Sequence, residues 1–270
     1  MPELPEVETT RRGVEPELAG QIVTEVVVRN SALRYPVPVH LPATLAGQRL
    51  LAVRRRGKYL LFVFDRGTLM VHLGMSGSLR VLPRSAPPQR HDHLDIAFGS
   101  RTLRYRDPRR FGLALWVEGD TTMHPLLAPL GLEPDDPSLD GDWLHSQLRS
   151  RSAPVKQVIM DSHLLVGVGN IYANESLFRA GIRPQTPARK LSLARCSMLV
   201  KTIRETLQDA LAAGGSSLRD FVHSDGQPGY FQQQYFVYDR DGDPCRICGS
   251  GIKTVRMAGR STYFCPKCQR

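Results

Sequence analysis

The sequence lacks any apolar run long enough to cross a bilayer. Its first residues, MPELPEVET, hold two prolines and three glutamates in place of the apolar segment of a secretory signal. It also contains no internal repeat and no low-complexity segment. These absences argue against a membrane, secreted or repeat protein. We therefore expect a globular cytoplasmic protein without a membrane partner.

Acidic residues are scarce relative to basic ones. The 270 residues include 26 Asp and Glu against 36 Lys and Arg, a formal net charge of +10, and the sequence pI is about 9.7. Such an excess favours a polyanionic partner. The basic residues cluster at 54–58, 101–110 and 149–151. Each cluster is either solvated surface charge or a set of phosphate contacts, and their number favours phosphates.

The periodicity of apolar residues changes along the chain. Residues 4–19 predict a short helix, with Glu6 and Glu8 near its start, where the helix dipole favours acids. Residues 22–117 read mainly as strands with hairpin turns, which indicates an antiparallel sandwich or barrel. Residues 118–140, rich in Pro, Gly and Asp, suggest a linker.

The second half of the chain is helical in pattern. Three helices are expected, at 154–161, 170–181 and 192–214. Ser192 is placed to cap the third helix. Cys196 lies within that helix at apolar spacing, so we interpret it as a core residue. We expect an α+β fold. The chain is expected to divide into three domains, at residues 1–131, 132–235 and 236–270.

The other four cysteines stand close to the C-terminus as Cys245-x2-Cys248 and Cys265-x2-Cys268. This spacing fits a tetrahedral four-thiolate zinc site, with disulfides as the weaker alternative in a reducing compartment. Because four thiolates leave no open position, one structural Zn²⁺ is expected. The segment between the pairs predicts a hairpin that projects Arg260 outward, either towards a phosphate or as a solubilising turn residue.

A glycine turn precedes the second helix. The stretch LLVGVGNIYANESLF places Gly167 and Gly169 before Asn170. The helical context does not fit a dinucleotide-binding motif and favours a helix–turn–helix, whose free amides face an anion. Asn170 either caps the helix or holds a phosphate.

These motifs together resemble the formamidopyrimidine-DNA glycosylase family of base-excision repair. PELPEVET, RRGKYLL, HLGMSGSL, HDHLD, RDPRRFG, VGVGNIYANESLF and the cysteine tail occur in that family's order, from residue 2 to residue 269. The resemblance implies an N-terminal β-sandwich, a helix–two-turn–helix domain and a zinc finger. It also implies a monomer of the bacterial cytoplasm and nucleoid, which excises 8-oxoguanine and formamidopyrimidines from double-stranded DNA and then cuts the strand.

The resemblance assigns catalytic roles to four residues. Pro2 is the amine nucleophile once Met1 is removed, and a terminal amine suits this role because its pKa lies near about 8. Glu3 is the general acid or base, Lys58 contacts a phosphate and donates a proton in β-elimination, and Arg260 assists δ-elimination. Taken alone, these residues are an ordinary N-terminal proline and solvated charges.

The resemblance also assigns contacts with DNA. Met75, Arg109 and Phe111 fill the space left by a flipped nucleotide, with Arg109 facing the orphaned cytosine. Outside the family, Met75 and Phe111 are core candidates. Further contacts fall on His72, His91 and Arg151, and the loop 216–232 closes over the flipped base. His72 is otherwise a core histidine, and His91 with His93 otherwise forms a metal-binding pair.

Two alternatives remain at this point. Endonuclease VIII-like glycosylases share the proline start, the helix–two-turn–helix and the finger, but act on oxidised pyrimidines. RDPRRFG with a separate methionine favours the purine-specific branch. A non-catalytic zinc-ribbon DNA-binding protein accounts for the charge and the cysteines, but not for Pro2-Glu3 together with Lys58.

Overall fold

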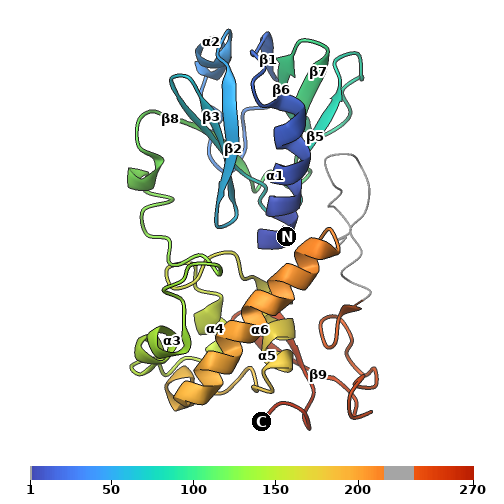
Figure 1. The fold of residues 1–270 in the computed structure, drawn as a ribbon. Helices are drawn as coiled ribbons and strands as arrows, with labels where there is room; N and C mark the ends of the chain where they lie inside the picture. The colour runs from blue at the N-terminus through green and yellow to red at the C-terminus, as the bar shows by residue number, and fades with distance from the viewer. Residues whose placement is uncertain (1, 216–233) are drawn as a thin grey trace. The chain divides into compact units, whose positions relative to one another are not determined.

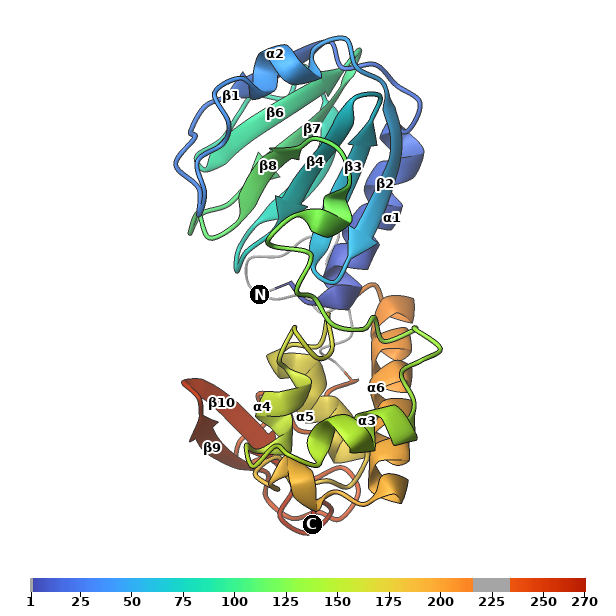
Figure 2. The ribbon, with the colours of Figure 1, turned by 90° about the vertical axis from the view of Figure 1, so that its left-hand side faces the viewer.

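The structure is a computed structural model that describes residues 2–215 and 234–270. These residues form two compact units, which Figures 1 and 2 show from two sides. One unit contains the chain up to Ala128 together with 213–215, and the other contains 129–212 and 234–270. The expected loop 216–232 lies outside the described residues. Among the described helices, none combines the length and apolar character needed to span a membrane.

Two antiparallel four-stranded sheets build the first unit. One sheet has the order β1-β6-β7-β5, with strands β1 (Glu25–Val28), β5 (Ser78–Pro83), β6 (Asp92–Phe98) and β7 (Arg101–Arg106). The other has the order β2-β3-β4-β8, with strands β2 (Leu50–Arg56), β3 (Tyr59–Phe64), β4 (Gly67–His72) and β8 (Leu113–Val117). The predicted sandwich and the α+β class are thereby confirmed.

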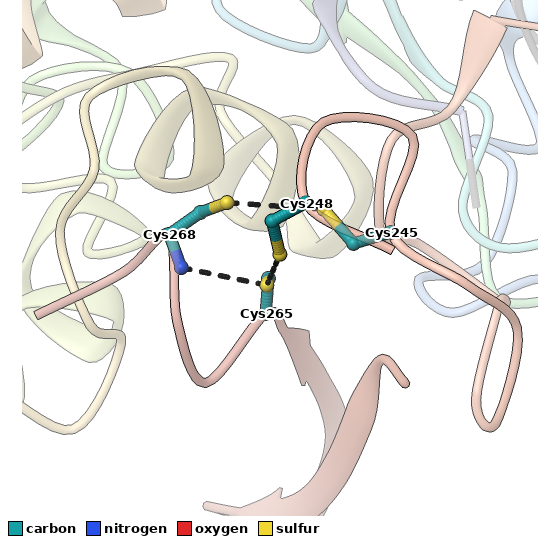
Figure 3. Close-up of side chains that lie close together, drawn as sticks. All are labelled: Cys245, Cys248, Cys265 and Cys268. Atoms are coloured by element: carbon teal, nitrogen blue, oxygen red, sulfur yellow. Dashed lines mark hydrogen bonds between the residues drawn. The ribbon is translucent and has the colours of Figure 1, made fainter. Parts of the chain in front are cut away.

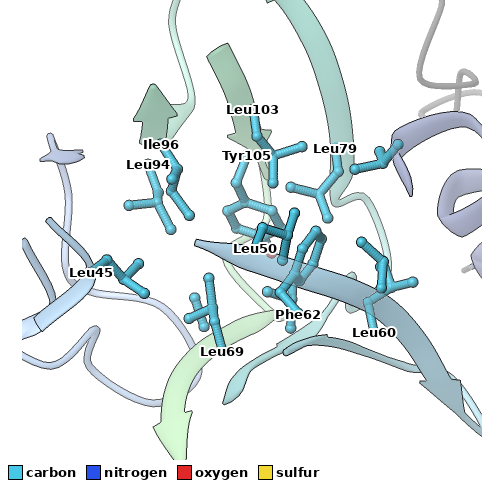
Figure 4. Packing of buried hydrophobic residues seen from close by; sticks show 14 of the residues in the cluster. Leu45, Leu50, Leu60, Phe62, Leu69, Leu79, Leu94, Ile96, Leu103 and Tyr105 are labelled. Atoms are coloured by element: carbon cyan, nitrogen blue, oxygen red, sulfur yellow. The ribbon is translucent and has the colours of Figure 1, made fainter. Parts of the chain in front are cut away.

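The apolar side chains of the two sheets meet in one core (Figure 4). Leu50, Leu60 and Phe62 come from one sheet, and Leu94, Ile96 and Leu103 come from the other; each is at most 2% exposed. Most of β3 is buried, as its continuous apolar run predicts. The predicted turns are also present, because Phe64 pairs with Gly67 and Phe98 pairs with Arg101.

Helix α1 (Leu4–Leu18) packs along β2 and β5, the edge strands of the two sheets (Figure 1). Val7, Val14 and Leu18 join the sandwich core from this helix. The helix therefore covers strand edges that would otherwise stay open to pairing. The short helix α2 (Leu41–Leu45) lies near β1. The predicted linker contains a single turn of 3₁₀-helix, η1 (Thr121–Met123).

The second unit is helical and ends in a hairpin. Its helices are α3 (Gly141–Leu148), α4 (Val155–Ile159), α5 (Asn170–Arg179), η2 (Ala188–Lys190) and α6 (Leu193–Ala212). Helices α3 and α5 pack on α6, and the hairpin of β9 (Lys253–Met257) and β10 (Arg260–Phe264) packs against α5 (Figure 2). The three predicted helices are confirmed. Cys196 is fully buried in α6, and Ser192 Oγ accepts from the backbone N–H of Arg195 at 3.4 Å.

Candidate functional site

The N-terminal segment enters α1 through a reciprocal pair of glutamates. Glu3 is the N-cap residue, and its backbone N–H donates to Glu6 Oε2 at 2.8 Å while its own side chain faces the N–H of Glu6. Pro2 is buried, and Glu3 and Glu6 are 2% and 0% exposed. The sequence predicts only that Glu6 and Glu8 stand near the helix start, where the helix dipole favours acids. The structure adds Glu3, so the residue beside the N-terminal proline is held by the helix start.

Glu8 does not act at the helix end. It accepts hydrogen bonds from Arg11 and Arg12 on its own helix and from Arg55 on β2. Burial by itself would raise the pKa of Glu8, but these arginines hold it below its usual value. One basic residue of the cluster at 54–58 is therefore used to join α1 to the sandwich, and the phosphate interpretation of that cluster is wrong for Arg55.

The cluster at 101–110 also contains a structural arginine. Arg104 is 5% exposed and forms a two-pronged pair with Asp95, from Nε at 2.8 Å and from Nη2 at 2.7 Å. These charged hydrogen bonds hold the pKa of Asp95 below its ordinary value against the opposing effect of burial. Arg104 is thus unavailable to a phosphate.

Lys58 lies in a two-residue hairpin turn. Arg56 pairs with Tyr59, so the turn consists of Gly57, whose φ of 55° suits glycine, and Lys58. The lysine is partly exposed. The pKa of His72, on β4, is lowered to about 4. Burial is the largest cause, and the positive charges of Lys58 and Arg34 lower this pKa further. His72 Nδ1 accepts from the backbone N–H of Gly74 at 3.0 Å, which fits a neutral ring.

Met75, Arg109 and Phe111 all stand on exposed loops of the first unit. Met75 and Phe111 are 40% and 47% exposed, so neither is a core residue. The guanidinium of Arg109 lies over the ring of Phe111, 4.8 Å from its centroid. A Cβ at Gly74 would come within 2.5 Å of the backbone nitrogen of Gly112, so the two loops touch backbone to backbone.

Within the described residues, no third candidate ligand joins His91 and His93 to form a metal site. His93 is only 4% exposed. His93 Nε2 lies 2.8 Å from the carbonyl oxygen of Asp107, to which it must donate because a carbonyl can only accept. His91 precedes β6 with a φ of 74°.

The four cysteines lie together at the base of the hairpin (Figure 3). All four Sγ atoms fall within 4.8 Å of one another. The pair Cys245–Cys268 is separated by 3.9 Å and the pair Cys248–Cys265 by 3.4 Å. A tetrahedral zinc with bonds of about 2.3 Å sets its sulfurs about 3.8 Å apart, so this cluster fits the ion. Within the described part of the chain, it is the one group of three or more candidate ligands placed to hold a metal.

Arg260 is the first residue of β10, directly after the hairpin turn at Ala258 and Gly259. Its side chain is exposed. It lines a hollow of about 240 Å³ together with Lys156 and Asp161. Arg151 lies in the same unit, and its Nη1 is 3.4 Å from Asp161 Oδ2. Both arginines thus border one part of the second unit.

Lys156 is a buried cation that the sequence interpretation missed. It is 2% exposed, and its Nζ donates to Asn170 Oδ1 at 2.7 Å and to Thr262 Oγ1 at 2.6 Å. Asn170 in turn donates from Nδ2 to the carbonyl of Ser261 at 3.1 Å. Asn170 follows the N-cap Gly169 and therefore links the helix start to β10 instead of capping the helix. The sequence signal that could have indicated this burial is a single lysine within the apolar pattern PVKQVI.

Relatives of known identity match the whole chain. Family models described as the formamidopyrimidine-DNA glycosylase N-terminal domain, its H2TH domain, and a zinc finger found in FPG and IleRS match residues 1–114, 130–222 and 242–270. The formamidopyrimidine-DNA glycosylase of Methylobacillus flagellatus is 58% identical over 100% of this chain and 97% of its own length. The chain belongs to the formamidopyrimidine-DNA glycosylase family.

Solved structures of family members share the fold. The Thermus thermophilus MutM (Fpg) protein matches with a TM-score of 0.90 at 41% identity, over 99% of this chain and 98% of that one. The Lactococcus lactis Fpg in complex with abasic-site DNA matches with a TM-score of 0.92 at 34% identity, over 99% of both chains. A mutant of the same protein bound to Fapy-dG-containing DNA matches with a TM-score of 0.93 over 100% of both chains.

Family membership confirms the resemblance drawn from the motifs. The finger model covers all four cysteines, so one structural zinc ion belongs to this glycosylase fold. The relatives carry the glycosylase name, and neither the endonuclease VIII-like alternative nor the zinc-ribbon alternative gains support from them.

Proposed function

We propose that this protein excises oxidised purines, 8-oxoguanine and formamidopyrimidines, from double-stranded DNA and then cuts the strand by β,δ-elimination. The main support for this proposal is membership of the glycosylase family, because the chain is 58% identical over its full length to a curated member. Fpg structures bound to abasic-site and Fapy-dG DNA support the same substrate class. The protein works as a monomer on DNA of the bacterial nucleoid, with functional parts at 1–131, 132–235 and 236–270.

Catalysis starts at the amine of Pro2 after removal of Met1. The nitrogen lone pair attacks C1′ of the damaged nucleotide, and the base leaves with the electrons of the glycosidic bond and a proton. Opening of the sugar ring and loss of the amine proton give a Schiff base. Loss of the C2′ proton then breaks the C3′–O bond, a second elimination breaks the C5′–O bond, and hydrolysis returns the free amine.

The neighbouring side chains supply proton transfer and charge. Glu3 protonates the sugar ring or the leaving base; it directly follows Pro2 in the chain and is the N-cap of α1. Lys58 contacts the phosphate of the damaged nucleotide and serves β-elimination, for which its short hairpin turn supports a fixed position. Arg260, exposed at the start of β10, grips phosphates beside the lesion and aids δ-elimination. Zinc holds the finger and takes no part in the chemistry.

Excision requires a flipped nucleotide, and the vacated space needs a filler. Met75, Arg109 and Phe111 enter that space, and their exposure on two touching loops supports the assignment. Four further residues contact the DNA backbone: His72, His91, Arg151 and Asn170. The proposed base-covering loop 216–232 lies outside the described residues.

Borohydride trapping on DNA with 8-oxoguanine opposite cytosine tests the proposal. The protein without Met1 should form a covalent adduct, protein that intact mass shows to retain Met1 should not, and a Pro2→Gly variant, which offers a primary amine in place of the secondary one, should form less adduct. Lys201→Gln is the matched control, because Lys201 has a 66% exposed side chain on α6. Cleavage of thymine glycol but not 8-oxoguanine would refute the substrate class, and absence of any adduct would refute the enzyme.

A further inference from the structure

The buried carboxylate of Asp107 has no role in the chemistry above. Asp107 is 0% exposed and stands in the motif RDPRRFG, directly after β7. A buried carboxylate is expensive to desolvate unless hydrogen bonds surround it. Its partners therefore indicate what it does.

Asp107 binds both loops that carry the proposed void fillers. Oδ1 accepts from Ser76 Oγ at 2.6 Å, and Ser76 directly follows Met75. Oδ2 accepts from the backbone N–H of Gly112 at 2.9 Å, and Gly112 directly follows Phe111. One carboxylate thus joins the Met75 loop to the Phe111 loop.

The same carboxylate fixes the backbone of Arg109. The N–H of Arg109 lies 3.1 Å from Ser76 Oγ and 3.3 Å from Asp107 Oδ1. Tyr105 Oη donates to Oδ2 at 3.1 Å, and burial together with Asp107 raises the pKa of Tyr105, which keeps this hydroxyl protonated.

The main chain of Asp107 anchors the segment that carries His91. The N–H of Asp107 donates to the carbonyl of His91 at 3.1 Å, and its own carbonyl accepts from His93 Nε2 at 2.8 Å. All of these contacts lie within the first unit. Asp107, a buried residue, is thus hydrogen-bonded to three short exposed segments: the Met75 loop, the Arg109–Phe111 loop and the segment that carries His91.

We propose that Asp107 is a positioning residue that locks the Met75 loop to the Arg109–Phe111 loop, so that the three side chains enter the duplex as one preformed wedge. This inference rests on the proposed function. Preformed geometry matters because ordering flexible loops during flipping would consume binding energy.

Asp107→Asn is the sharpest test, because Asn keeps the shape of the side chain. In either amide orientation its NH₂ group faces a backbone N–H, that of Arg109 or that of Gly112, so one loop contact is lost. We expect kcat/KM for 8-oxoguanine excision from duplex DNA to fall about 10- to 100-fold. Cleavage of a single-stranded oligonucleotide with a preformed abasic site should stay within about twofold, since no void needs filling there.

Tyr105→Phe is the matched control. It removes a hydrogen bond to the same carboxylate but leaves the contacts of Asp107 with Ser76, Arg109 and Gly112. Duplex excision should change by no more than about threefold. Ser76→Ala serves as a second loop variant should Asp107→Asn unfold, with an expected loss of about 3- to 10-fold.

A double-mutant cycle with Phe111→Ala separates positioning from general stability. Once a filler is absent, Asp107→Asn should cost no more than about threefold in duplex excision. The proposal is overturned by an equal loss on single-stranded abasic DNA, by an undiminished loss in the Phe111→Ala background, or by full duplex activity of the folded variant. Failure of the proposed function is distinct, since unmodified protein would then leave 8-oxoguanine duplexes uncut.

Discussion

Glu175 Oε1 accepts a hydrogen bond from the backbone N–H of Val237 at 3.0 Å, across 62 residues of sequence. The same carboxylate accepts from the N–H groups of Phe236 and Tyr238 at 2.9 and 2.8 Å. Burial raises the pKa of Glu175, and these three hydrogen bonds act against that rise. A helix residue of α5 therefore holds the chain that leads into the zinc hairpin.

Replacing Glu175 with alanine should destabilise the second unit. Three backbone N–H groups would lose their acceptor around the fully buried Val237. We expect the free energy of unfolding, measured by urea denaturation, to fall by about 2–4 kcal/mol. Glu205→Ala, which removes an exposed partner of Lys201, should cost less than about 0.5 kcal/mol. Equal costs for the two variants would contradict the tethering role of Glu175.

The lowered pKa of His72 predicts a loss of stability in acid. The folded-state pKa of about 4 lies below the ordinary value of 6.5, so the unfolded chain binds more protons in between. Stability is therefore fully present above pH 6.5 and is lost as the pH falls through about 4. Burial is the main effect that lowers the pKa of His72, Lys58 and Arg34 lower it further, and Asp107 acts in the opposite direction.

His72→Asn isolates this contribution, because an asparagine oxygen can replace Nδ1 as the acceptor for Gly74. The variant should lose about 1–3 kcal/mol less than the unmodified protein between pH 7 and pH 4.5. Urea denaturation at a series of pH values gives both curves. Parallel curves would show that His72 does not titrate as described.

Removal of one zinc ligand should unfold the finger. Cys265→Ser breaks the four-thiolate set, and structural zinc contributes about 10–16 kcal/mol of apparent binding free energy. We expect metal analysis to fall from one zinc per chain to near zero, together with loss of DNA binding. Cys196→Ala alters a thiol buried in α6, outside the cluster, and should keep one zinc. Retention of zinc by Cys265→Ser would exclude this ligand set.

Lys156→Met should weaken DNA binding without loss of zinc. The substitution removes the donor that Asn170 and Thr262 share, so the start of α5 and the strand β10 are no longer fixed to each other through it. A cost of about 1–2 kcal/mol corresponds to a Kd for duplex DNA raised roughly 5- to 30-fold. Lys201→Met, at an exposed position of α6, is the control. An unchanged Kd for Lys156→Met would refute the link.

Features set by short-range spacing could be predicted from the sequence. The two Cys-x2-Cys pairs predict the sulfur cluster. Alternation with turn residues predicts hairpin turns within 22–117, and the structure has them between Phe64 and Gly67 and between Phe98 and Arg101. Helix limits followed from caps and glycines, as at Ser192. These features depend on residues close in sequence, where backbone geometry alone brings the groups together.

Partners of buried charges could not be predicted in this way. Arg55 was grouped with phosphate-binding candidates but pairs with Glu8, 47 residues away. Lys156 reaches Thr262 across 106 residues. Spacing carries no signal for such contacts, because they arise only when separate elements pack.

The sequence by itself determined the family, the zinc ligands and the order of strands followed by helices, because these rest on local patterns and on motifs in a set order. Only the tertiary structure decided which charges are structural and which are exposed. A charge is tolerated in the interior only with hydrogen-bond partners, and packing supplies those partners. Asp107 shows the difference: its motif is evident in the sequence, while the loops it joins are evident only in the fold.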